Sequence, residues 1–74
     1  MNQNKKTILE ALFDLLKEFK GYKNLESITY DVANDRAVIK IAGDAKLHWC
    51  SLKNIYNMDI VKTVTDFIKA RLNN

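Results

Sequence analysis

The spacing of apolar residues changes twice along this chain, and this change limits its fold more than any other feature. Residues 8–19 and 60–72 repeat apolar side chains every three or four positions, whereas residues 27–41 alternate apolar and polar ones. The first spacing is typical of an amphipathic helix, and the second of a strand with one buried face. The sequence therefore predicts a helix at each end of the chain and strands between them.

The first helix is expected to begin near Ile8 and to end near Lys20. Thr7 and Glu10 have the spacing of a capping box, in which each side chain pairs with a backbone N–H of the first turn. Gly21 can adopt the left-handed conformation that closes a helix. The apolar stripe consists of Ile8, Leu9, Leu12, Phe13, Leu15, Leu16 and Phe19. A stripe of this width is expected to face a core.

Two strands, about 27–32 and 37–41, are expected to form a hairpin. Asn34 and Asp35 tolerate positive φ, so they suit a two-residue turn between the strands. This turn sets the following pairs: Val32 with Ala37, Tyr30 with Ile39, and Ile28 with Ile41. All six side chains then share one face of the sheet. Turn and alternation agree on this register.

A third strand is expected at about 46–50, and the turn before it decides which side chains it buries. A two-residue turn at 43–44 would put Leu47 and Trp49 on the outer face beside Val38. A three-residue turn at 43–45 pairs Ile41 with Leu47 and Ile39 with Trp49, and turns three side chains outward: Lys46, His48 and Cys50. We expect the longer turn, because it removes the only tryptophan from water.

The rest of the chain is expected to form an ordered connection and a second helix. Leu52, Ile55 and Tyr56 suggest a short turn against the core, and Asn57 or Asp59 can cap the helix that follows. The helix stripe consists of Ile60, Val61, Val64, Phe67, Ile68 and Leu72, with Lys62, Asp66 and Lys69 on the wet side.

Together these elements predict one α+β domain over residues 1–74, in the order α-β-β-β-α. A chain of 74 residues suits a single core. Each helix has one apolar stripe and the hairpin has one apolar face. We therefore expect a three-stranded antiparallel meander with both helices packed on one side.

The residues do not indicate an enzyme, a cofactor or a metal site. His48 and Cys50 are the only clustered reactive side chains, and a Cys-His nucleophile would also need an orienting group, an oxyanion site and a pocket. The two glycines, Gly21 and Gly43, do not make a phosphate-binding loop. One cysteine and one histidine leave no zinc-binding spacing, and the carboxylates are scattered.

With the expected third-strand register, the outer sheet face carries a modest basic patch. It consists of Arg36, Lys40, Lys46 and His48. We expect a small non-enzymatic interaction or accessory protein that binds a protein partner, or a second copy of itself, through the open sheet face or edge. The alternative is a nucleic-acid-binding module that uses the patch. A net charge of +3 is mild for that role, and the patch lacks base-stacking aromatic residues. No small-molecule substrate is evident.

The element order α-β-β-β-α is similar to that of double-stranded RNA-binding domains, which have about this length. Those domains open their second helix with a glycine-containing loop and a Lys-Lys-x-Ala-Lys run. Here Asn57-Met58-Asp59-Ile60-Val61-Lys62 stands in that place. The resemblance is therefore one of topology.

Composition also suggests where the protein works. No apolar stretch approaches the roughly 20 residues of a membrane span, and no secretion signal is visible. A single cysteine fits a reducing compartment, so we expect a cytoplasmic protein without membrane contact. Abundant Lys, Asn and Ile with no proline suggest an AT-rich bacterial or mobile-element genome.

Overall fold

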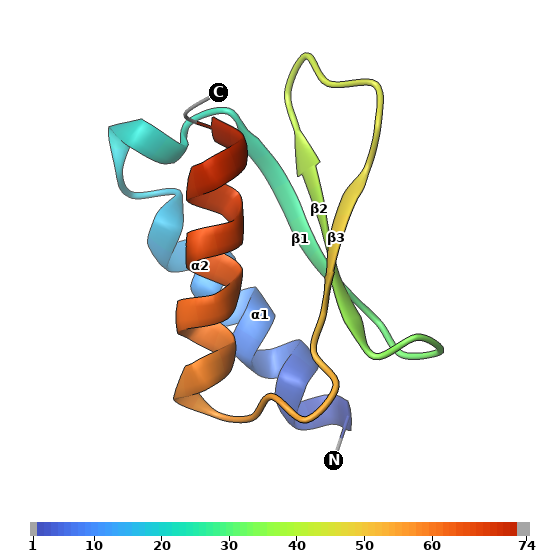
Figure 1. Cartoon of the computed structure of the whole chain (residues 1–74). Coiled ribbons are helices and arrows are strands. Elements are labelled where there is room, and N and C mark those ends of the chain that lie inside the picture. The colour runs from blue at the N-terminus through green and yellow to red at the C-terminus, as the bar shows by residue number, and fades with distance from the viewer. Residues whose placement is uncertain (1, 73–74) are drawn as a thin grey trace.

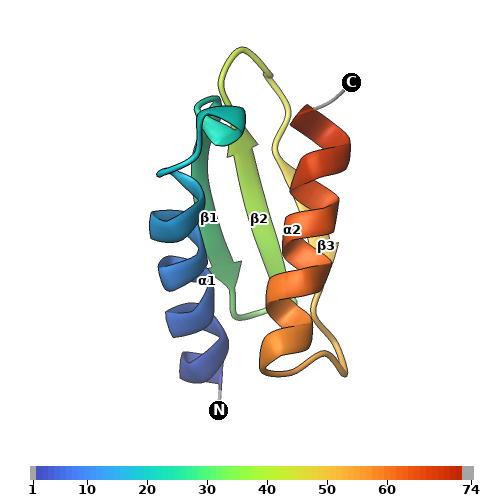
Figure 2. The same ribbon diagram turned by 90° about the vertical axis from the view of Figure 1, so that its left-hand side faces the viewer.

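The computed structural model describes residues 2–72, and its elements follow the predicted order. They are α1 (Asn2–Leu16), the 3-10 helix η1 (Lys20–Tyr22), β1 (Leu25–Asp31), β2 (Arg36–Ile41), β3 (His48–Ser51) and α2 (Met58–Leu72). The strands form one antiparallel sheet in the order β1-β2-β3. Both helices lie on one side of it, α1 over β1 and α2 over the β2–β3 side (Figure 1 and Figure 2). The predicted α+β fold is confirmed.

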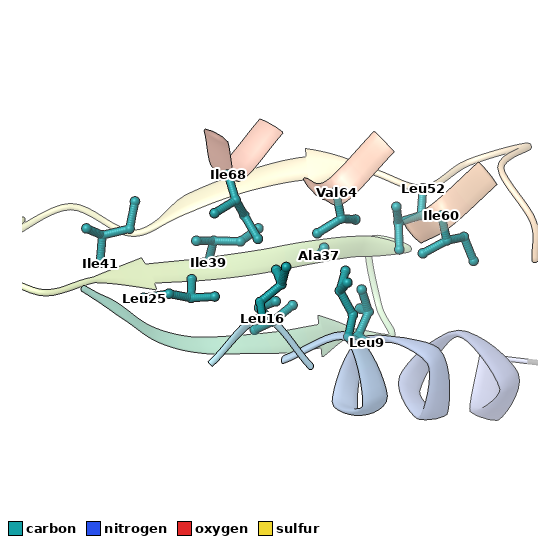
Figure 3. Close-up of a cluster of buried hydrophobic side chains, with 12 residues drawn as sticks. Leu9, Leu16, Leu25, Ala37, Ile39, Ile41, Leu52, Ile60, Val64 and Ile68 are labelled. Atoms are coloured by element: carbon teal, nitrogen blue, oxygen red, sulfur yellow. The ribbon is translucent and has the colours of Figure 1, made fainter. Parts of the chain in front are cut away.

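The core lies between the helices and the inner face of the central strand β2. Ala37 and Ile39 of this strand are completely buried. Side chains from both helices converge on them (Figure 3): Leu9 and Leu16 from α1, and Ile60, Val64 and Ile68 from α2. Burial of such a side chain contributes about 1.5–3 kcal/mol. The core therefore fixes which face of each strand turns inward.

Helix α1 begins earlier than the capping spacing predicts. It starts at Asn2, so Thr7 lies inside the helix and does not cap it. The added turns carry Lys5, which is buried and bonds to Asp35 of the β1–β2 turn and to the carbonyl of Leu52. This tertiary contact stabilises the turns that precede the apolar stripe.

The C-terminal end of α1 also differs from the prediction. The helix ends at Leu16, and Phe19 is extended, with φ −106° and ψ 136°. Gly21 lies in η1 and has no positive φ, so it does not close the helix. Leu15 and Phe19 were expected in the buried stripe, but both are more than half exposed.

The β1–β2 hairpin has most of the predicted inner face but a register shifted by two residues. Tyr30 pairs with Ala37 and Ile28 with Ile39, so four residues, 32–35, form the turn. Asp31 shapes this turn by accepting hydrogen bonds from the backbone N and Nδ2 of Asn34, at 3.4 and 2.9 Å. Side-chain direction in a strand repeats every two residues, so the shift keeps the other five predicted residues on the inner face. Val32 was also expected there, but it lies in the turn and is 59% exposed.

The β2–β3 register contradicts the expected three-residue turn. Trp49 pairs with Val38 and Cys50 with Ala37, which is the register of the shorter turn that we considered second. Strand β3 begins at His48 rather than Lys46. Trp49 is therefore on the outer face, and His48 and Cys50 are on the inner face.

The last third of the chain largely follows its prediction. In the connection, Leu52 is completely buried and Ile55 is half-buried, but Tyr56 is exposed. The N–H of Leu52 donates to the carbonyl of Asp35 at 2.9 Å, which ties the connection to the hairpin turn. In α2 the buried residues are Ile60, Val64 and Ile68.

Candidate interaction surfaces

Within residues 2–72, no other helix or strand covers the outer face of the sheet (Figure 1). Its central row crosses all three strands, because Thr29 pairs with Val38 and Val38 pairs with Trp49. Trp49 is 54% exposed, and Leu47, just before β3, is 60% exposed. An exposed tryptophan beside a valine forms an apolar patch of the kind that often marks an interaction surface.

Ion pairs flank this row on both sides. On one side, Arg36 Nε donates to Asp31 Oδ2 at 2.9 Å. Hydrogen bonds from Asn34 and then from Arg36 lower the pKa of Asp31 below its usual value. On the other side, Lys40 Nζ lies 3.6 Å from a carboxylate oxygen of Glu26. Each base on the face thus has an acid beside it.

The four residues of the predicted basic patch do not come together. Arg36 and Lys40 lie on the outer face, where Asp31 and Glu26 neutralise them. Lys46 lies in the loop before β3, outside the sheet. His48 pairs with Ile39 and turns to the inner side, where its Nε2 lies 2.6 Å from Asp44. The prediction of one basic face is wrong because the third strand has the other register.

Arg36 takes part in the apolar row instead. Its guanidinium carbon lies 4.7 Å from the centroid of the Trp49 ring. A guanidinium over an indole is attracted by the ring electrons, and it also holds the ring in one orientation. In the sequence, only the alternative two-residue turn at 43–44 predicts that Trp49 lies on this face.

The opposite side of the molecule has a second surface, an apolar groove between the two helices. Its cavity is about 450 Å³ and is lined by Ile8, Ala11, Leu12 and Leu15 of α1, by Asn57 just before α2, and by Met58 and Val61 of α2. Met58 is 74% exposed and Leu15 is 52% exposed. We call this feature the interhelical groove. Sequence analysis did not predict it, because all of its α1 leucine and isoleucine residues were assigned to the core.

A polar cluster lies next to this groove, and every strong donor in it is already used. Lys5 Nζ donates to the two carboxylate oxygens of Asp35, at 2.9 and 3.0 Å, and to the Leu52 carbonyl at 2.8 Å. The hydroxyl of Tyr30 donates to Asp35 at 2.5 Å. The hydrogen bonds from Tyr30 and then from Lys5 lower the pKa of the Asp35 carboxyl. This saturated cluster links α1, the hairpin turn and the connection, so its role is structural.

The inner-facing Cys50 does not have the surroundings of a nucleophile. It is half-buried against the core, and burial raises the pKa of its thiol. A raised pKa disfavours the reactive thiolate. The neighbouring His48 is bonded to Asp44. In residues 2–72, no group of three or more His, Cys, Asp or Glu side chains is placed to hold a metal ion.

Comparison with known proteins adds no relative to this description. No protein-family model, curated protein or solved structure matches the chain. Within residues 2–72 there is also no helix with the length and apolar character needed to cross a membrane.

Proposed function

We propose that this chain is a small non-enzymatic interaction protein that associates through the outer face of its sheet. The observation that carries the proposal is the row formed by Thr29, Val38 and Trp49, with a tryptophan more than half exposed on a rigid sheet. Covering this row with another protein surface removes apolar area from water, which is the main driving force of association. We also propose a cytoplasmic location, which the single cysteine favours.

A second copy of the chain is the partner that this face fits best. The face pairs two acids, Glu26 and Asp31, with two bases, Lys40 and Arg36, whereas the chain as a whole has a net charge of +3. Two copies that meet through this neutral face avoid the repulsion that their other surfaces would cause. A two-fold axis brings the same apolar row to both sides of the contact.

The size of the face indicates a weak dimer. Strands lie about 4.8 Å apart and rise about 3.3 Å per residue, so three strands of this length cover on the order of 300 Å². Stable interfaces bury roughly 800 Å² on each partner. We therefore expect dissociation in the micromolar range or weaker. The edges of β1 and β3 offer unpaired backbone groups as further contact points.

Binding of nucleic acid is the second candidate. Trp49 gives the outer face the exposed aromatic ring that the predicted patch lacked, but the charges of that face give less support than expected. The net charge of +3 still favours contact with phosphates. However, the basic residues on the outer face are paired with acids, and Lys46 and His48 lie elsewhere. If the chain binds duplex RNA or DNA through Lys40 and Lys46, affinity should fall steeply with salt, and Lys40→Glu with Lys46→Glu should abolish it.

Sedimentation across a dilution series, followed in parallel by Trp49 fluorescence, tests self-association. The natural chain should form a dimer at high concentration, and emission of its only tryptophan should shift to the red as the dimer dissociates. Val38→Lys should yield a monomer, because it places a charge in the centre of the contact. Ala70→Lys on the exposed surface of α2 is the matched control and should leave the dimer intact.

The opposite results would reject this function. A chain that stays monomeric at the highest soluble concentration, with constant Trp49 emission, does not associate through this face. Equal loss of dimer in Val38→Lys and Ala70→Lys would mean that added charge, rather than the sheet face, controls assembly.

A further inference from the structure

Helices α1 and α2 lie on the side of the sheet away from its outer face (Figure 2). The interhelical groove, lined by residues of these helices, is open to solvent. A sheet-to-sheet dimer would leave it uncovered on each copy. Met58 and Leu15 project at the two sides of the groove and are 74% and 52% exposed. Methionine is flexible and polarisable, so it adapts to the shape of an incoming apolar side chain. The groove therefore offers a binding surface that the proposed sheet contact does not use.

The shape of the groove suits a helix. On α1 its lining extends from Ile8 to Leu15, which is about 10 Å at 1.5 Å per residue. Met58 and Val61 form the opposite wall along one turn of α2. Two helices with a furrow between them accept the ridge of a third helix, whose apolar residues recur three, four and seven positions apart.

Charges around the groove indicate the polar residues of such a partner. Asp14 lies on the exposed side of α1, one turn after Ala11. Glu18 lies in the turn that follows α1, where its N–H donates to the carbonyl of Leu15 at 3.1 Å. Neither carboxylate has an ion-pair partner within residues 2–72. On the α2 side, Lys62 is neutralised by Asp66 at 2.9 Å. The α1 side of the groove thus ends in two unpaired acids, on a chain that is basic overall.

We infer that the interhelical groove binds an amphipathic helix of a partner protein, with the apolar stripe of that helix in the groove and Lys or Arg beside α1. Apolar contact with Leu15, Met58 and Val61 supplies affinity, and the free carboxylates of Asp14 and Glu18 select basic flanks. Combined with a sheet-to-sheet dimer, the two grooves would face away from each other. The dimer would then hold two partner helices at once.

Two synthetic helical peptides with the same leucine spacing test this inference. One carries Lys and the other Glu on the flanks of the leucine stripe, and binding is measured by fluorescence anisotropy and by NMR shifts of the protein. The Lys peptide should bind at least about tenfold more tightly than the Glu peptide. Its shifts should map to Ala11, Leu15, Met58 and Val61.

Three variants locate the contact and its charge. Met58→Glu changes an exposed side chain in the groove and should weaken the Lys peptide about tenfold or more, whereas Ala70→Glu on another side of α2 should not. Asp14→Lys combined with Glu18→Lys should reverse the preference, so that the Glu peptide binds better. Thermal unfolding of each variant shows that the fold is kept.

Four outcomes would overturn the inference. If neither peptide shows saturable binding, or if Met58→Glu binds the Lys peptide as well as the natural chain does, the groove is not a helix site. Equal binding of the two peptides would reject the basic partner. Loss of the dimer in Met58→Glu, with Val38→Lys still dimeric, would show instead that a second copy fills the groove.

Discussion

The ammonium of Lys5 donates to both carboxylate oxygens of Asp35, at 2.9 and 3.0 Å, across 30 residues of chain. The Lys5 side chain is only 8% exposed, and that of Asp35 is 30% exposed. Breaking a partly buried pair costs more than its net contribution, because the remaining charge loses its partner and is not fully hydrated. This contact is therefore a sensitive point of the fold.

Lys5→Ala should lower the free energy of unfolding by about 2–4 kcal/mol. The control is Lys62→Ala, which removes an ion pair whose side chains are 79% and 57% exposed. Exposed pairs contribute about 0.5 kcal/mol or less. Urea unfolding of the two variants checks the difference, and equal losses would show that Lys5 does not anchor α1.

Tyr30 should make stability sensitive to alkaline pH. Its pKa is raised from 10.0 to about 12, first by burial and then by its hydrogen bond to Asp35. The folded state thus favours the neutral phenol, so this contribution is complete below about pH 10 and is lost as pH rises through about 12. In Tyr30→Phe the free energy of unfolding should fall less over this range. Identical alkaline profiles would contradict the raised pKa.

The outward position of Trp49 predicts a small cost for its removal. Trp49→Ala should lower monomer stability by about 1 kcal/mol, whereas truncation of a buried tryptophan costs about 3–5 kcal/mol. Leu52→Ala, at a completely buried position, should cost about 2–5 kcal/mol. The losses for the two variants are compared from unfolding curves measured at a protein concentration too low for the dimer to form. A larger loss for Trp49→Ala than for Leu52→Ala would mean that the tryptophan is in the core.

The two glycines should respond oppositely to substitution by alanine. Gly43 has φ +83°, a conformation that costs an L residue about 1–2 kcal/mol. Gly21 has no positive φ, and a Cβ at this position would meet no atom within 4 Å. Gly43→Ala should therefore lower the melting temperature, and Gly21→Ala should leave it unchanged or raise it slightly. Similar melting temperatures would contradict the strained turn at Gly43.

The inner face of the hairpin could be predicted from sequence even though its register could not. Alternation alone places Tyr30, Ile28 and Ile39 on one face, and a shift of two residues leaves that face unchanged. The exact pairs depend on the hydrogen bonds that Asn34 gives to Asp31, which make the turn four residues long. Apolar periodicity contains no information about such side-chain contacts.

The beginning of α1 and the direction of Trp49 were decided by tertiary structure. Lys5 extends the helix because it finds Asp35 and the Leu52 carbonyl, which are distant in sequence. Trp49 was expected in the core because its burial removes a large apolar area from water, but that expectation left no space for α2. The small side chains of Ala37 and Cys50 face this helix, and Val64 packs beside Ala37 (Figure 3).

The sequence by itself determined the class of fold, because the periods of 3.6 and 2 residues are local and each requires one buried face. The candidate interaction surfaces were decided only by the tertiary structure. The register of β3 differs by one residue from the expected one, so Trp49 lies on the outer face in place of His48 and Cys50. The outer face is therefore neutral and apolar, where a basic patch was expected. The groove beside Met58 likewise exists only because α1 and α2 pack on the same side of the sheet and leave space between them.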